Sequence, residues 1–107
     1  MVSRIVIVAY KPLPGKYEAL EALVSTHYSR LFKEGLVTNR PPTILVAADQ
    51  TIIEIFEWVS KEAINTAHSN PSVLAMWQEF SAVCEYIPAG QVKEFQSMFS
   101  EFTPING

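Results

Sequence analysis

The stretch EIFEWVSKEAINTAHSNPSVLAMW, residues 54–77, decides the fold of this chain. It opens with an apolar strand, followed by Ser60, a residue type that caps helix N-termini by accepting a backbone hydrogen bond. A short helix is predicted after this serine. Asn70 and Pro71 then predict a second helix, because proline at the first helical position loses no intrahelical hydrogen bond. A strand and two helical segments therefore lead into the C-terminal part of the chain.

The sequence before this stretch alternates between strand and helix. Residues 2–10 are rich in Val and Ile and predict a strand, which the following prolines end. From Lys16 apolar residues recur at steps of three and four, which predicts a helix that stops at Gly35. Residues 36–48 are predicted to be extended, with a bend or break at a pair of prolines. After a tight turn, residues 52–58 predict a third strand.

Downstream, the helix that begins at Pro71 is predicted to reach Pro88, with Cys84 on its apolar stripe. The tail has two interpretations: residues 91–96 fit a helical turn, whereas residues 98–105 contain enough Phe and Thr for a last strand. The complete order is β-α-β-β-α-β. It predicts a single α+β domain over all 107 residues, with a ferredoxin-like antiparallel sheet of four strands and the helices on one face.

Both faces of the predicted sheet are apolar, although the helices can cover only one of them. Apolar residues of the first strand fall on both faces: Ile5, Ile7 and Ala9 on one, and Val6, Val8 and Tyr10 on the other. An exposed face of an antiparallel sheet is usually polar, so something must cover the second face. We predict a homodimer that packs through this open sheet face. The alternative is that the C-terminal tail folds across it.

Composition excludes several kinds of partner. The chain has a net charge of −3, and its eight Lys and Arg residues do not cluster, so it lacks the positive face that nucleic-acid binding requires. The apolar run near its N-terminus is too short for a membrane span or a signal-peptide core. Cys84 is the single cysteine, so no disulfide forms within the chain and a reducing compartment is the simpler expectation. We therefore expect a cytoplasmic protein without membrane or nucleic-acid partners.

Short motifs along most of the chain follow an order that is similar to a known superfamily. They are a proline-glycine turn before the first helix (residues 14–16), a strand ending in Glu57 and Trp58, a Ser60-capped helix with Ala63, Ala67 and His68, and Asn70 and Pro71 followed by Trp77. Together with the order of elements, they resemble the dimeric α+β barrel superfamily, in particular its antibiotic-biosynthesis-monooxygenase-like (ABM-like) branch. The resemblance implies a dimeric barrel. Its members include cofactor-independent oxygenases of polycyclic quinols, haem-degrading enzymes, isomerases and proteins without an assigned activity, because one fold hosts many functions.

Two histidines are candidates for a site. His68 lies near the end of the short helix and suits a proton acceptor or an orienting group, because histidine titrates near neutral pH. The alternative is that it only hydrogen-bonds nearby backbone at the helix end. His27 lies within the apolar stripe of the first helix, where a buried, hydrogen-bonded histidine is favoured over one that binds a ligand.

Four aromatic residues complete the predicted substrate-binding group, to which His27 also belongs. Trp58 and Trp77 would form an aromatic wall for a planar substrate, and the alternative is that both belong to the core. Tyr10 and Tyr86 each place a phenol at the end of an apolar segment, which is common at a pocket rim or an interface.

Two carboxylates are candidates for a general base. Glu54 and Glu57 point to opposite faces of the third strand, and Glu54 shares its face with Phe56. One of the two is expected to face an apolar interior, where a carboxylate needs a partner and suits a general base. The sequence leaves open which one it is. The alternative is an ion pair with Arg4 or Arg40.

These residues support one main hypothesis and two alternatives. The His and Cys residues show no metal-ligand spacing, and neither a phosphate loop nor a dinucleotide fingerprint is present, so no metal or organic cofactor is expected. The main hypothesis is a cofactor-independent monooxygenase that acts on a small aromatic or quinol-type molecule in a pocket between sheet and helices. His68, Glu57 and Glu54 would be its catalytic residues. The alternatives are a non-enzymatic small-ligand-binding or interaction dimer and, less favoured, a haem protein with His27 or His68 as axial ligand.

Overall fold

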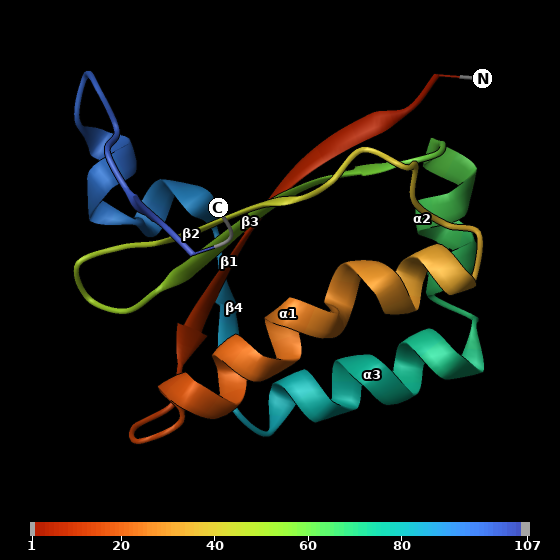
Figure 1. The fold of residues 1–107 in the computed structure, drawn as a ribbon, viewed down its shortest axis with the longest axis horizontal. Helices are drawn as coiled ribbons and strands as arrows, with labels where there is room; N and C mark the ends of the chain where they lie inside the picture. The colour runs from red at the N-terminus through yellow and green to blue at the C-terminus, as the bar shows by residue number, and fades with distance from the viewer. Residues whose placement is uncertain (1, 106–107) are drawn as a thin grey trace.

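In the computed structural model, which describes residues 2–105, an antiparallel sheet of five strands packs with three α-helices (Figure 1). The elements are β1 (Arg4–Pro12), α1 (Tyr17–Lys33), β2 (Thr43–Val46), β3 (Ile52–Trp58), α2 (Lys61–Ala67), α3 (Pro71–Ser81), β4 (Cys84–Ile87), two short 3-10 helices (Ala89–Gln91 and Lys93–Gln96) and β5 (Thr103–Pro104). The strands are ordered β4-β1-β3-β2-β5, and each neighbouring pair is antiparallel. The predicted α+β class is therefore confirmed.

The helix boundaries follow from residues that the sequence marks as caps. Ser60 Oγ accepts a hydrogen bond of 3.1 Å from the backbone N–H of Ala63 and so caps α2. Asn70 caps α3 in the same way. After α1, Gly35 has a φ of 72°, a left-handed conformation that glycine adopts without a steric penalty. No helix in the described part of the chain is long and apolar enough to cross a membrane.

The C-terminal half differs from the prediction in one element that shapes the site. α3 ends at Ser81 instead of reaching Pro88, and Cys84 belongs to β4. β4 pairs with the end of β1, which itself extends to Pro12. The predicted long helix is wrong because pairing with a strand far away in the sequence outweighs a helical apolar spacing that continues through residues 83–84.

The tail beyond β4 is mostly irregular. Two 3-10 helices occupy Ala89–Gln91 and Lys93–Gln96, so a helical turn was the better of the two interpretations for residues 91–96. Within residues 98–105 only Thr103–Pro104 forms a strand, β5, which pairs with the edge of β2. The interpretation of a last strand in residues 98–105 is therefore confirmed only for these two residues.

The two faces of the sheet have different covers (Figure 1). α1 and α3 lie side by side across one face, and the main core lies between these helices and the sheet. The C-terminal segment lies on the opposite side, where Val92, Phe95 and Phe102 pack with Ala9 and Ile53. The alternative that the tail folds across the second face is therefore confirmed for this part of the face.

The rest of the second face is open. Ile5 and Ile7 of β1 point to it and are 56% and 50% exposed. Apolar side chains grouped on one exposed surface are typical of a contact with a partner. The homodimer through this face stays a prediction.

Candidate functional site

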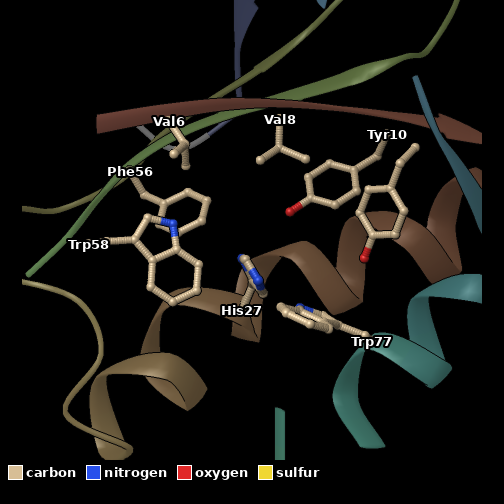
Figure 2. A pocket seen from close by; sticks show the side chains of 8 residues that line it. Val6, Val8, Tyr10, His27, Phe56, Trp58 and Trp77 are labelled. Atoms are coloured by element: carbon tan, nitrogen blue, oxygen red, sulfur yellow. The ribbon is translucent and has the colours of Figure 1, made fainter. Parts of the chain in front are cut away.

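A cavity of about 370 Å³ lies between the sheet and the helices (Figure 2). Its volume is in the range of small-molecule binding sites. Its lining is almost entirely apolar or aromatic and comes from five elements: Val6, Val8 and Tyr10 of β1, His27 of α1, Phe56 and Trp58 of β3, Trp77 of α3, and Tyr86 of β4.

Strand alternation and register place the sheet side of this cavity. Because successive side chains of a strand point to opposite faces, Val6, Val8 and Tyr10 share the face that the helices cover. The pairing of β1 with its two neighbours puts Val6 opposite Phe56 and Tyr10 opposite Tyr86. Three hydrogen-bonded strands therefore fix the positions of most lining residues.

One carboxylate stands behind the lining. Glu54 of β3 is fully buried, and its Oε1 accepts a hydrogen bond of 2.6 Å from the Tyr10 hydroxyl. The same oxygen lies 2.8 Å from Nδ1 of His27. Glu54 Oε2 is also buried and has no hydrogen-bond partner among residues 2–105. Tyr10, Glu54 and His27 thus form one polar cluster inside the apolar core.

The protons of this cluster can be assigned from its geometry. Burial, and next the adjacent Glu54, raise the pKa of Tyr10 well above its ordinary value, so the phenol stays protonated and donates. With Glu54 ionised, its carboxylate can only accept, and Nδ1 of His27 carries the hydrogen of their contact. Nε2 is then the ring nitrogen of His27 that is left to accept a proton.

Aromatic neighbours hold the His27 ring in its orientation. The ring meets Phe56 edge to face, with the centroids 5.2 Å apart and an interplanar angle of 87°. It meets Phe80 of α3 similarly, at 5.4 Å and 75°. Packing from two sides, added to the bond to Glu54, leaves the imidazole little freedom to rotate.

The predicted aromatic residues all reach the cavity. Trp58 is buried and Trp77 is partly buried, and Figure 2 shows the two indoles on either side of His27. Tyr86 is 50% exposed and its ring centroid lies 5.5 Å from that of Tyr10. Partial burial raises the pKa of Tyr86 to about 12, so this phenol is neutral.

His68 lies elsewhere. It is the exposed C-cap residue of α2 and is absent from the lining of the cavity. Its ring contacts Trp77, with the centroids 5.3 Å apart. His27 is therefore part of the cavity lining, whereas His68 lies outside the cavity and only contacts one lining residue, Trp77.

Glu57 points away from the cavity, to the other face of β3. Its carboxylate accepts hydrogen bonds from Ser3 Oγ at 2.7 Å, Thr38 Oγ1 at 2.8 Å and Arg40 Nε at 3.1 Å. These bonds, with the one from Ser3 as the largest cause, lower the pKa of Glu57. The alternative of pairing with Arg40 therefore describes Glu57, whereas Glu54 is the interior carboxylate.

Sequence reasoning did not connect Glu54 with its two partners. It placed Glu54 on the same strand face as Phe56, and it placed His27 on an apolar helical stripe. Both positions are those of buried residues, and a buried carboxylate needs a donor. That need was the signal that could have joined Glu54 to His27 before the structure was known. Val6 and Val8 were assigned to a face without being recognised as lining.

Other reactive groups do not add to the site. In residues 2–105, no three His, Cys, Asp or Glu side chains gather in a way that could hold a metal ion. Cys84 is buried, and its Sγ donates a weak hydrogen bond of 3.3 Å to the carbonyl of Phe80. Burial raises the pKa of this thiol to about 11, which leaves almost no reactive thiolate at neutral pH.

No protein-family model matches this chain, and no curated protein matches it. The chemistry of the cavity is therefore the basis for a function. It combines a fixed imidazole backed by a carboxylate, two neutral phenols and two indoles, with no Lys or Arg in the lining. Such an arrangement can bind a flat apolar molecule and accept one proton from it.

Proposed function

We propose that the cavity binds a small aromatic molecule with a phenol-type hydroxyl and that Nε2 of His27 takes the proton of this hydroxyl. The observation that carries the proposal is the 2.8 Å contact between His27 Nδ1 and the buried Glu54 in the wall of an apolar cavity. A carboxylate behind an imidazole holds it in one tautomer and stabilises the cation that forms on proton transfer. His27, not His68, is then the base.

The charge of the site favours a neutral ligand. The lining contains neither Lys nor Arg, and Glu54 places a carboxylate directly behind His27. An anionic ligand such as a carboxylate would move from water into an apolar cavity where no positive side chain lines the wall. Burying an unpaired charge in this way is costly. A neutral phenol loses little solvation and meets an acceptor at His27.

The walls favour a flat ligand. Trp58, Trp77 and Phe56 present aromatic surfaces to the cavity, while Val6 and Val8 form an aliphatic side (Figure 2). Aromatic rings stack favourably in offset or edge-to-face geometries. A ligand of one or two fused rings suits a cavity of about 370 Å³.

The proposed reaction, supported by the resemblance to ABM-like proteins, is a cofactor-independent oxygenation. Loss of the hydroxyl proton to His27 gives an electron-rich phenolate, whose para carbon transfers an electron to dioxygen and then forms a C–O bond. Removal of the hydrogen on that carbon breaks the O–O bond, and the second oxygen leaves as water. In sum, one phenol and one dioxygen give one quinone and one water, so the substrate itself supplies all electrons.

We also propose that the chain is a ferredoxin-like, dimeric α+β barrel. The strand order β4-β1-β3-β2, with α1 and α3 on one face, supports the first part. The exposed Ile5 and Ile7 support the second, because a second copy would cover them. Static light scattering at micromolar concentration tests the dimer, and a monomer would disprove it.

Oxygen uptake with 1-naphthol as probe tests the enzyme. The wild-type protein should consume oxygen and release 1,4-naphthoquinone, whereas His27→Gln should lose at least about 100-fold in rate, the usual contribution of a general base. His68→Gln is the matched control and should stay within about threefold of wild type, because His68 lies outside the cavity. If His68→Gln loses the activity and His27→Gln keeps it, the base is wrongly assigned.

A binding function without turnover is the second candidate. It is favoured by the half-exposed Tyr86 in the lining, since a reaction through a peroxide needs water kept away from it. Calorimetry then detects binding of 1-naphthol but not of 1-naphthoate, while the oxygen electrode stays silent. A strong Soret shift on adding haem would instead support the haem alternative.

A further inference from the structure

We propose that Tyr10 is a positioning residue for the base: by donating its hydroxyl to Glu54, it sets the pH above which Nε2 of His27 is unprotonated and free to take the proton of a ligand. The inference rests on the proposed role of His27. The Tyr10 ring also meets the His27 ring edge to face, with the centroids 6.4 Å apart, but its hydroxyl reaches His27 through the carboxylate between them.

The geometry makes Glu54 Oε1 a shared acceptor. The Tyr10 hydroxyl lies 2.6 Å from this oxygen and Nδ1 of His27 lies 2.8 Å from it. Glu54 Oε2 has no hydrogen-bond partner among the described residues. Within this part of the chain, the Tyr10 hydroxyl and His27 Nδ1 are therefore the two groups that stabilise the carboxylate by hydrogen bonding. Bonds from neutral or charged donors to a buried ion are among the stronger ones in proteins. The share that Tyr10 contributes is therefore large.

The direction of the effect follows from the charge of the cluster. With His27 neutral the cluster has one negative charge, and with His27 protonated it has none. The Tyr10 hydroxyl stabilises the negative state more than the neutral one, because hydrogen bonds to an ionised acceptor are stronger. Without this hydroxyl the cluster should take up its proton at higher pH. Such linked groups titrate as a unit, so the midpoint belongs to the cluster.

Few other groups near His27 titrate. β1 contributes Tyr10, β3 contributes Glu54, and β4 contributes Tyr86 and Cys84. From α3, Phe80 packs against the imidazole and Trp77 lines the same cavity, and neither has a titratable side chain. Tyr86 and Cys84 both stay protonated well above neutral pH, because burial raises their pKa values to about 12 and about 11.

The test is an NMR pH titration of the histidine ring signals in the ligand-free protein. In Tyr10→Phe the midpoint of His27 should move up by about one pH unit, the size expected when a charged buried group loses one good donor. Tyr86→Phe is the matched control, because it removes a phenol from the same cavity that makes no hydrogen bond to Glu54. His68 is exposed and serves as an internal reference that should not move.

A second variant covers the case in which Tyr10→Phe does not fold. Site-specific 3-fluorotyrosine at position 10 keeps the shape of the ring but makes its hydroxyl a stronger donor, so the His27 midpoint should move down. An unchanged midpoint in either variant that folds, or an equal shift in Tyr86→Phe, overturns the inference. The titration needs neither a ligand nor a reaction with oxygen. Its result is therefore independent of whether the oxygen-uptake experiment succeeds or fails.

Discussion

Glu54 and Glu57 stand three residues apart on β3 and show how differently the two faces of the sheet treat the same side chain. Glu54 points under the helices, is fully buried and meets Tyr10 and His27. Glu57 points to the other face and meets Ser3, Thr38 and the exposed Arg40. On the helix-covered face water cannot replace a lost partner, whereas Glu57 is partly exposed and its partner Arg40 is exposed, so water can replace a partner there. The buried glutamate therefore organises a site, and the other one links β3 to the segments that precede β1 and β2.

The largest effect expected from this difference concerns the removal of each carboxylate. Glu54→Ala should lower the free energy of unfolding by about 3–5 kcal/mol, because it leaves the Tyr10 hydroxyl and the His27 ring buried without their acceptor. Glu57→Ala is the matched control and should cost clearly less, since water reaches its partners. Urea denaturation of both variants measures the difference. Equal losses would mean that the burial of Glu54 is not what matters.

A second prediction compares the two halves of the outer face. Ile53 is buried beneath the C-terminal segment, so Ile53→Ala should cost about 2–4 kcal/mol of unfolding free energy. Ile7 lies on the open half at 50% exposure, so Ile7→Ala should cost about 1 kcal/mol or less in a monomer. Thermal or urea unfolding gives both values. A small loss for Ile53→Ala would show that the C-terminal segment does not cover this residue in solution.

The smallest expected effect is the pH dependence due to Glu57. Its pKa in the folded chain is lowered below the ordinary value of 4.5, so its contribution to stability is present above that pH. The contribution is lost as the pH falls through the lowered pKa, because protonation then favours the unfolded chain. Wild type should therefore be more stable than Glu57→Gln at pH 7, and the difference should shrink as the pH falls below 4.5. A constant difference across this range would contradict the role of the charge.

The sequence predicted those parts of the fold that depend on local signals. Ser60, Asn70 and Pro71 mark helix starts through bonds within three residues, and these boundaries are confirmed. β4 was missed because its reason for existing is the pairing of Cys84 with Pro12, which no local pattern contains. The apolar spacing of α3 simply ran on into the strand.

The sequence predicted most residues of the candidate site, but not which of them contact one another. Strand alternation placed Glu54 and Trp58 on one face, and helical spacing placed His27 on an apolar stripe. The contact between Glu54 and His27 depends on how α1 packs across β3, which is a property of the assembled core. His68 was predicted as a base because it lies near the end of the short helix and histidine titrates near neutral pH, but that position does not bring it into the cavity.

The lining of the cavity has a practical consequence. The chain contains two tryptophans, and both of them, Trp58 and Trp77, line this one cavity. Its tryptophan fluorescence therefore comes entirely from the indoles that an aromatic ligand would touch. Binding should quench or shift the emission without any added label, so a library of small molecules can be screened on the unmodified protein, and Trp77→Phe reports how much of the signal comes from each side of the ligand.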